Sequence, residues 1–226
     1  TQSGGAAEYA LAPEQNCVRL PEGLSAFQAA LTEPVACSVN AFDSLPRRLG
    51  DHYLVYGAGT MGLIMARLAM TNGAAGVSVI ELQPGRRQVA ESLGLHAVAS
   101  ADEAPREGGR GHEVVIDCTG VAAAINDGLP RVAPGGTFVH IGVPPEGTLM
   151  EYDAHRVYRY EISIVGSMSV QHSMERAADL LAAGLIDVDA VITDRFDLDG
   201  CGDALQAIRD GRGIKSVVLP HGELMC

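Results

Sequence analysis

The chain has 226 residues, of which 47% are hydrophobic and 19% charged, and its formal net charge at pH 7 is -12. This balance is typical of a soluble globular protein with a sizeable core and excludes a mainly disordered one. Because no basic cluster is longer than a pair of arginines, a nucleic-acid partner is not expected. No stretch approaches the roughly 20 apolar residues of a membrane span, and the first residues do not resemble a signal peptide.

The cysteines are odd in number, scattered, and never in a C-x-x-C pair: Cys17, Cys37, Cys118, Cys201 and Cys226. This pattern favours reduced thiols in a cytoplasmic protein and argues against a self-contained zinc lobe. The seven histidines show no H-x-x-x-H or H-E-x-x-H spacing, so we interpret them as structural or surface groups.

The first elements expected along the chain are a short strand-like run over residues 8–13 and, after a polar link, a helix over residues 24–42. From His52 onwards, strands and helices alternate. The strands share short apolar, β-branched runs at residues 52–57, 77–81, 96–100, 114–120, 135–142 and 162–167. The helices between them are predicted at residues 60–73, 85–94 and 122–132, the last interrupted near Pro130.

Strands that alternate with helices of this length predict an α/β fold, a doubly wound parallel sheet with helices on both faces. This domain is expected over residues 35–170. After it, the pattern predicts a helix, a strand, a helix and a terminal strand at residues 174–186, 191–198, 202–211 and 214–220.

The stretch LVYGAGTMG leads from the first strand into a helix and contains Gly57, Gly59 and Gly62. In a dinucleotide-binding turn the first glycine permits the tight turn, the second lets the backbone approach a pyrophosphate, and the third lets helix and strand pack closely. Glu81 ends the second strand, where a carboxylate can accept hydrogen bonds from the adenosine ribose. The order of strand, turn, helix, strand and acid favours a dinucleotide site over a packing turn; a methyltransferase is the other enzyme class with such a turn.

Several motifs, taken together and in this order, resemble a known family: GGAAEYALAP, LTEPVACSVNAF, VYGAGTMGLIMARLA, IDCTG, APGGTFVHIGV and IKSVVLP. They are similar to the medium-chain, zinc-dependent alcohol dehydrogenase superfamily, nearest its polyol (sorbitol) and threonine dehydrogenase branch. The resemblance implies a Rossmann domain flanked by remnants of a GroES-like catalytic domain. Residues 1–34 would be a remnant of the catalytic domain with the linking helix, residues 35–170 the dinucleotide-binding domain, and residues 171–226 the return to the catalytic domain.

The resemblance also implies cofactor-binding roles. Around the pyrophosphate it implies Gly57, Gly59, Met61, Gly62 and Lys215. At the adenosine end it implies Glu81 on the ribose, Arg86 beside the adenosine, and Cys118 and Thr119 at the adenine. At the nicotinamide end it implies Ile141, Gly142 and Val143 by the ribose and Ser167, Met168 and Ser169 by the carboxamide.

Glu33 matches a carboxylate at the catalytic zinc of the family, acting as a ligand or through a water, and is the one catalytic and metal residue implied here. Family members carry a longer segment ahead of the GGAAEY match, and that segment supplies the other zinc ligands, the start of the proton relay and the structural zinc lobe. The resemblance therefore implies zinc only in the full-length protein, and an inactive cofactor part in this chain. Cys37 is interpreted as a buried structural thiol, and Asp117 as a residue that orders a strand end.

The implied function is that of an NAD(H)-dependent dehydrogenase for an alcohol or polyol, as a homodimer or homotetramer in which the strand at residues 162–167 meets its copy across a two-fold axis. NAD is expected over NADP because Glu81 would repel a ribose 2′-phosphate, with Arg86 and Arg87 free to turn to solvent. Two alternatives remain: a non-catalytic NAD-sensing module, and a zinc-free, NADPH-dependent reductase of the same superfamily.

Overall fold

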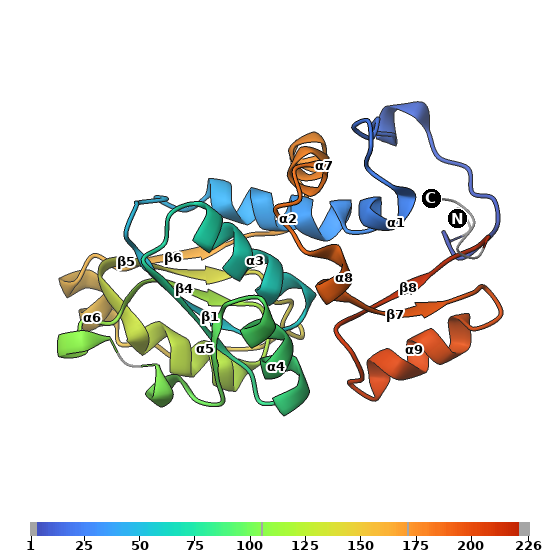
Figure 1. Ribbon diagram of the computed structural model, residues 1–226. Coiled ribbons are helices and arrows are strands. Elements are labelled where there is room, and N and C mark those ends of the chain that lie inside the picture. The colour runs from blue at the N-terminus through green and yellow to red at the C-terminus, as the bar shows by residue number, and fades with distance from the viewer. Residues whose placement is uncertain (1–3, 105, 171, 222–226) are drawn as a thin grey trace.

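The computed structural model describes residues 4–104, 106–170 and 172–221. Within these residues the chain forms one six-stranded parallel sheet in the order β3-β2-β1-β4-β5-β6 and a separate two-stranded parallel sheet, β7-β8 (Figure 1). The six strands are β1 (His52–Tyr56), β2 (Gly76–Ile80), β3 (His96–Val98), β4 (His112–Asp117), β5 (Val132–His140) and β6 (Ser163–Gly166). Strand order reverses between β1 and β4, which is the topological switch point of a doubly wound fold.

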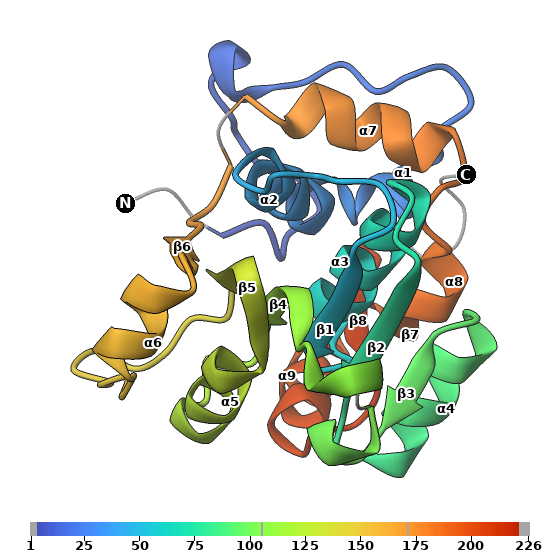
Figure 2. The same ribbon diagram turned by 90° about the vertical axis from the view of Figure 1, so that its left-hand side faces the viewer.

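The central strands β1 and β4 of the large sheet are buried on both faces, which explains their continuous apolar runs. Tyr53 and Val55 point into one hydrophobic cluster, whereas Leu54 and Tyr56 point into the other. The first cluster includes side chains from α3 (Thr60–Thr71), and the second includes Ile125 of α5 (Ala122–Gly128). Figure 2 shows α3 and α5 beside the sheet, with α4 (Pro84–Ser92) alongside β3 and α6 (Ala154–Arg159) beyond β5.

The helices ahead of the sheet pack against a helix that follows it. The Ser25 side chain caps α1 (Ala26–Ala29) in a capping box with Gln28, and α2 (Thr32–Asp43) restarts after a short break. The helix α7 (Met174–Ala182) lies across α2, where the Ser173 hydroxyl donates to the Ala36 carbonyl oxygen at 2.9 Å. An ion pair between Arg176 and Asp43, with 2.6 Å between Nη2 and Oδ2, ties the same two helices together.

The last elements are α8 (Val188–Val191), β7 (Ile192–Phe196), α9 (Cys201–Arg209) and β8 (Lys215–Val218). The helix α9 packs on β7 and β8 (Figure 1), whereas Val188 and Val191 of α8 and Ile192 of β7 belong to the first hydrophobic cluster of the large sheet. The His221 ring lies edge-on to the Tyr9 ring, with 6.1 Å between centroids, so the N-terminal segment lies beside the end of β8. Short 3-10 turns complete the described chain at Glu14–Asn16, Ala101–Glu103, Glu107–Gly109 and Leu129–Arg131.

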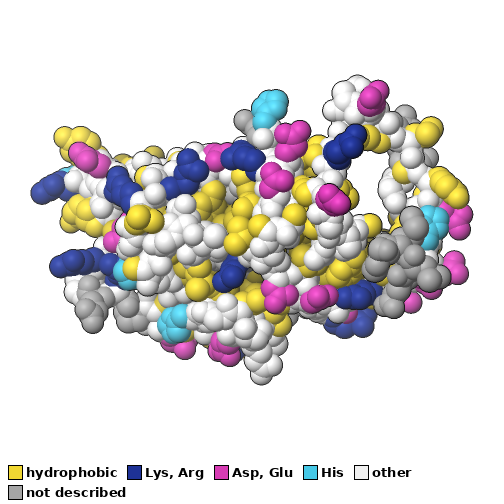
Figure 3. All heavy atoms as spheres, turned by 45° about the horizontal axis from the view of Figure 1, so that its top comes forward, with side chains coloured by type: hydrophobic (Ala, Val, Ile, Leu, Met, Phe, Trp, Pro, Cys, Tyr) yellow, Lys and Arg dark blue, Asp and Glu magenta, His cyan; other side chains and the backbone are white. Residues whose placement is uncertain are grey.

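The surface carries both signs of charge. On the face shown in Figure 3, Lys and Arg side chains are interspersed with Asp and Glu side chains and with hydrophobic ones. Among the described residues, no helix is both long enough and apolar enough to cross a membrane.

The predicted doubly wound sheet is confirmed, with all six of its strands and the three helices between residues 60 and 132 close to their expected places. Two expectations were wrong. Residues 8–13 form no strand, and the helix expected over residues 24–42 is two helices, α1 and α2. The helices α6 and α8 were not expected. The division at residues 34 and 35 falls inside α2, and the three-part domain division stays a prediction.

Candidate functional site

The glycine turn lies between β1 and α3, at the edge of the sheet where the parallel strands end. Gly57 has a φ of +96°, which a residue with a side chain rarely adopts, and its N–H donates to the Ile80 carbonyl oxygen at 2.8 Å. A Cβ added to Gly62 would overlap the Gly57 carbonyl oxygen. The first and third glycines of the motif are therefore required by the turn itself and by the contact between α3 and β1.

Gly59 differs from the other two glycines. It precedes α3 with a φ of -79°, and a Cβ added there would meet no protein atom within 4 Å. No side chain caps this end of α3, so the unpaired N–H groups of its first turn and the positive end of the helix dipole face outward. The fold does not need a glycine at this position, whereas close approach of a phosphate group does.

Glu81 follows β2 at the same edge and is only 8% exposed. Its carboxylate accepts hydrogen bonds from the Ala58 N–H at Oε2 and from the Gln83 N–H at Oε1, both at 2.9 Å. The first of these bonds joins Glu81 to the glycine turn. A carboxylate has about four acceptor positions, so these two bonds leave room for ribose hydroxyl donors.

The two arginines after Glu81 are both occupied with backbone carbonyls. Arg86 donates from Nε to Gly213 at 3.0 Å, and Arg87 donates from Nη1 to the Glu81 and Leu82 carbonyl oxygens at 2.7 and 2.9 Å. The expectation that they are free to turn to solvent was therefore wrong. Charged side chains on a helix are usually solvated, which is why the sequence suggested exposed arginines. Here backbone carbonyls of the neighbouring loops lie within hydrogen-bonding distance of both guanidinium groups.

Asp117 ends β4 and is fully buried. Its Oδ1 accepts hydrogen bonds from the Thr119 N–H and hydroxyl at 2.9 and 2.6 Å, and Gly120 N–H donates to Oδ2 at 3.2 Å. Burial alone would raise the pKa of Asp117, but the His140 ring, with Nδ1 at 3.8 Å from Oδ2, and the hydrogen bonds from Thr119 and Gly120 outweigh burial and lower it. Asp117 therefore fixes the turn that carries Cys118 and Thr119. Burial, and then the Asp117 charge, raise the pKa of the Cys118 thiol, so that it stays protonated.

The turns after β4 and β5 are in close contact. The N–H groups of Ile141 and Gly142 both donate to the Asp117 carbonyl oxygen at 2.9 Å, and a Cβ added to Gly142 would overlap the Gly120 N–H. Val143 follows with 90% exposure. These contacts bring the residues expected at the adenine and those expected at the nicotinamide ribose onto one edge of the sheet.

The residues after β6 lie next along the same edge. Ser167 donates from its N–H to the His140 carbonyl oxygen at 2.9 Å, and its hydroxyl accepts a hydrogen bond from Asn40 Nδ2 of α2 at 3.2 Å. Met168 is 86% exposed, and Ser169 has a φ of +54°. Asn40 was not expected near the site, because no local pattern links α2 to the end of β6.

Lys215 is the first residue of β8, and the residue before it, Ile214, contacts the start of α3 at this edge of the sheet. The Thr60 hydroxyl, at the first residue of α3, donates to the Ile214 carbonyl oxygen at 3.3 Å. The start of β8 therefore lies against the glycine turn. Met61 follows Thr60 in the first turn of α3 and is half-buried.

Glu33 lies apart from the other expected residues, on the exposed side of the first turn of α2. The Cys37 thiol, one turn on, donates to its Oε1 at 3.2 Å. Burial, and then the Glu33 carboxylate, raise the pKa of Cys37 to about 11, so the thiol is protonated at pH 7. In the described part of the chain, no three His, Cys, Asp or Glu side chains are grouped so that they could hold a metal ion.

A cavity of about 150 Å³ lies at the opposite edge of the sheet, where the strands begin, and its lining includes His52, His96 and His112. His112 is 6% exposed, and its Nδ1 has no hydrogen-bond partner among the described residues. Burial, followed by the Arg106 charge, lowers the pKa of His112 to about 4, so this imidazole is neutral at pH 7. The residues expected at the cofactor do not line this cavity.

Comparison with known proteins agrees with this geometry. Residues 60–183 match the model of the zinc-binding dehydrogenase family. The chain is 29% identical to D-arabinitol dehydrogenase 1 of Uromyces fabae, over 98% of this chain and 66% of that protein. It is 30% identical to sorbitol dehydrogenase of Bos taurus, over 89% of this chain and 59% of that protein.

Among solved structures, the chain resembles a protein of Sinorhizobium meliloti 1021 that is described as a zinc-binding dehydrogenase bound to NADP. The TM-score is 0.88 and the identity 30%, over 96% of this chain and 66% of that one. The chain thus spans less than two thirds of the length of each of these relatives. Because the family model covers more than half of the chain, this chain belongs to the zinc-binding dehydrogenase family.

Proposed function

We propose that this chain is the cofactor-binding part of an NAD(H)-dependent, zinc-type alcohol or polyol dehydrogenase. The observation that carries the proposal is the hydrogen bond from the Ala58 N–H to the buried Glu81 carboxylate, which joins the glycine turn and the acid of the second strand in one site. The Gly59 backbone and the first turn of α3 would hold the pyrophosphate. Bound NAD would supply the hydride acceptor.

The substrate class follows from the relatives, whose names are those of D-arabinitol and sorbitol dehydrogenases. A polyol or another secondary alcohol is therefore the proposed substrate. The proposed division of the chain is a dinucleotide-binding domain over residues 35–170, flanked by residues 1–34 and 171–226 that belong to the catalytic part. The cofactor contacts implied for Cys118, Thr119, Ile141, Gly142, Val143, Ser167, Met168 and Ser169 belong to the same proposal.

The described residues do not make a zinc site. Glu33 is the family-matched carboxylate, but among the described residues no three His, Cys, Asp or Glu side chains are grouped so that they could hold a metal ion, and a zinc site needs three or four converging ligands. Zinc is therefore proposed for the whole protein, with Glu33 as the one carboxylate that this chain would contribute. The four cysteines in the described residues have free thiols, with Cys226 outside them, and a cytoplasmic location is proposed on that ground.

NAD is the proposed cofactor, because the Glu81 carboxylate would lie beside the ribose 2′ position. At 4 Å, two like charges repel by about 1 kcal/mol in water and by about 4 kcal/mol at an effective dielectric of 20. Arg86 and Arg87 already donate to backbone carbonyls, so attracting a 2′-phosphate would require them to give up those bonds. The NADP in the Sinorhizobium meliloti relative is the observation that favours the alternative, an NADPH-dependent reductase.

Calorimetric titration of the chain with NADH and with NADPH tests the proposal. We expect NADH to bind at least about a hundredfold more tightly, the equivalent of about 2.7 kcal/mol. In Glu81→Ser the preference should shrink, since NADH loses its ribose acceptor while NADPH loses the repulsion. Equal dissociation constants in the unmodified chain would make the NADPH-dependent reductase the better proposal, and binding of neither nucleotide would contradict both.

A non-catalytic NAD-sensing module would bind NADH equally well. The β7–β8 sheet and the N-terminal segment beside it support the dehydrogenase, because the family resemblance implies that these pieces belong to the catalytic part. Activity of the whole protein with a polyol and NAD separates the two: a sensor would give none.

A further inference from the structure

Residues 211–214 join α9 to β8, and we name them the 211–214 segment. The Arg86 guanidinium of α4 donates from Nε to the Gly213 carbonyl oxygen at 3.0 Å and from Nη2 to the Gly211 carbonyl oxygen at 3.4 Å. One planar side chain thus holds two carbonyls of the segment, and the fixed geometry of a guanidinium suits it to this better than a lysine.

Two hydroxyls hold the end of the same segment. The Thr60 hydroxyl donates to the Ile214 carbonyl oxygen at 3.3 Å, and the Ile214 N–H donates to Thr193 Oγ1 of β7 at 2.8 Å. The next residue is Lys215. Its backbone position is therefore set by α3 on one side and by β7 on the other.

The segment packs closely against its neighbours on two sides. Gly213 has a φ of +61°, and a Cβ added there would overlap Asp194 and Thr193 of β7. Gly211 has a φ of +68°, and a Cβ added there would lie 3.3 Å from Gln83 Nε2, on the α4 side. Both faces of the segment are thus in contact with other parts of the protein.

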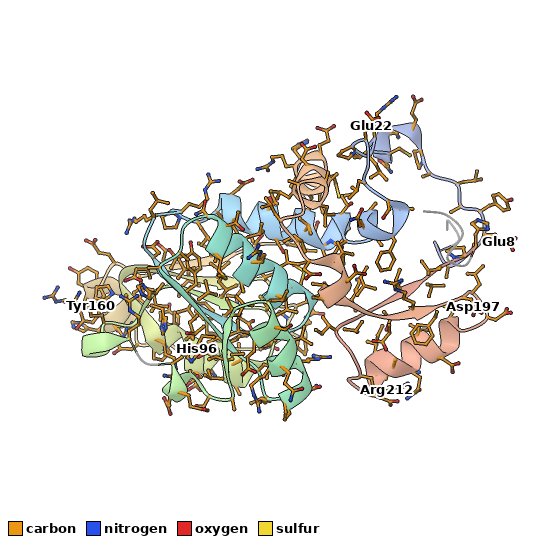
Figure 4. The ribbon with its side chains drawn as sticks, in the orientation of Figure 1. Glu8, Glu22, His96, Tyr160, Asp197 and Arg212 are labelled. Carbon is orange, nitrogen blue, oxygen red and sulfur yellow. The ribbon has the colours of Figure 1, made fainter. Side chains whose placement is uncertain are left out.

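Arg212 provides a contrast within the segment. Its side chain is exposed, as the labelled residue in Figure 4 shows, and its close ionic neighbour is Asp210, at 3.7 Å. Arg86, in contrast, donates hydrogen bonds from the helix after Glu81 to two backbone carbonyls of the segment.

We propose that Arg86 is a positioning residue that acts through Lys215. By holding the 211–214 segment against α4, it keeps the start of β8 beside the glycine turn, where the Lys215 ammonium can meet the cofactor pyrophosphate. The inference rests on the proposed function, since it assumes a dinucleotide at that turn. It replaces the direct contact between Arg86 and the adenosine that the family resemblance implies.

A double-mutant cycle distinguishes positioning of Lys215 by Arg86 from a direct contact between Arg86 and the cofactor. NADH affinity is measured for the unmodified chain, Arg86→Gln, Lys215→Met and the double variant. We expect Arg86→Gln to weaken binding by about tenfold, the equivalent of about 1.4 kcal/mol. In the Lys215→Met background the same change should have almost no effect, because the lysine it positions is gone. Arg86→Lys should recover part of the affinity, since one ammonium can still hold one carbonyl.

Arg67→Gln is the matched control. Arg67 also donates from Nε to a backbone carbonyl at 3.1 Å, but this carbonyl is that of Leu185, outside the 211–214 segment. The Arg67→Gln variant should leave NADH affinity unchanged. Hydrogen exchange of the ligand-free chain adds a readout that needs no cofactor: the Lys215 to Val218 amides should exchange faster in Arg86→Gln and not in Arg67→Gln.

Each outcome decides the question. If Arg86→Gln lowers NADH affinity equally in the unmodified chain and in Lys215→Met, Arg86 contacts the cofactor directly. If Arg86→Gln leaves the affinity unchanged, Arg86 neither contacts the cofactor nor positions Lys215. Each of these two results contradicts the inference. If the unmodified chain binds no NADH, the proposed function fails, and the exchange measurement still decides whether Arg86 holds the segment.

Discussion

At the scale of single residues, the three glycines of one motif have different reasons to be glycine. Gly57 needs its positive φ, and Gly62 needs to lack a Cβ that would overlap the Gly57 carbonyl. Gly59 has an ordinary φ and open space where its Cβ would be. The motif therefore contains two structural glycines and one, Gly59, that the fold itself does not require.

Gly59→Val should therefore abolish NADH binding and leave the fold intact, since the new side chain would project into the space proposed for the pyrophosphate, where a Cβ meets no other protein atom within 4 Å. Gly62→Ala should lower the free energy of unfolding by about 1–3 kcal/mol, because overpacking at a close contact forces the backbone to shift. Calorimetry with NADH and urea unfolding of both variants check this pair of results. Unchanged NADH affinity in Gly59→Val would show that the turn is not the cofactor site.

His112 makes stability depend on pH. Its pKa falls from an ordinary 6.5 to about 4 in the folded chain, through burial first and then the Arg106 and Arg131 charges, with Glu113 opposing. Between these values the unfolded chain binds a proton at His112 that the folded chain does not, so stability falls as the pH drops from 6.5 and the loss levels off below 4. The free energy of unfolding falls by about 3 kcal/mol in total over this pH range.

Urea unfolding at pH 7 and at pH 4.5 measures this loss. His112→Gln should reduce the difference between the two pH values, whereas His155→Gln, at an exposed position of α6, should not. A pH dependence unchanged in His112→Gln would mean that other groups cause it.

At the scale of elements, Asp117 governs how β4 ends. It accepts three hydrogen bonds from Thr119 and Gly120, and these bonds help to lower its pKa. Asp117→Asn should cost about 1–3 kcal/mol of stability, since an amide replaces one acceptor oxygen with a donor that faces other donors. It should also weaken NADH binding, because the turn with Cys118 and Thr119 is displaced.

Glu113→Gln is the control for Asp117→Asn, because Glu113 lies on the same strand but contacts Arg106 at the opposite edge. It should change stability and leave NADH affinity as it is. Urea unfolding and calorimetry on both variants test this, and an Asp117→Asn variant with unchanged NADH affinity would contradict the assignment of the β4 turn to the cofactor.

Elements also show what sequence patterns can and cannot predict. The strand–turn–helix around Gly57 was predictable, because its determinants are local spacing and alternation. The run over residues 8–13 has an apolar pattern, yet Leu11 is 93% exposed and no described strand pairs with it. The helix expected over residues 24–42 divides because a proline in the interior of a helix removes a backbone hydrogen bond. With α2 starting at Thr32, Pro34 lies in a first turn, where its missing N–H is not needed.

The unpredicted contacts of the candidate site join residues far apart in the chain. Arg86 meets Gly213, and Asn40 meets Ser167, each across 127 positions. Neither pair leaves a local signal, since any charged helix residue or amide would look the same in sequence. The family resemblance supplied the positions of Lys215 and Ser167, but not the residues that hold them.

At the scale of the whole molecule, β6 is an edge of the large sheet. Among the described strands it pairs with β5 alone, and Ile164 in its middle is 37% exposed. A strand with an open row of backbone groups and an apolar side chain favours pairing with another strand, and in a symmetric dimer the partner is its own copy.

We therefore expect a homodimer, alone or as half of a homotetramer, in solution. Ile164→Lys should give a monomer, because the charge would have to be buried at the strand pair, and edge charges oppose such pairing. Leu205→Lys, which adds the same charge at an exposed apolar position of α9, should leave the assembly as it is. Light scattering at micromolar concentration measures all three chains, with NADH affinity as the check that each variant is folded. A monomeric unmodified chain would contradict the role of β6, and a dimer retained in Ile164→Lys would move the interface to another surface.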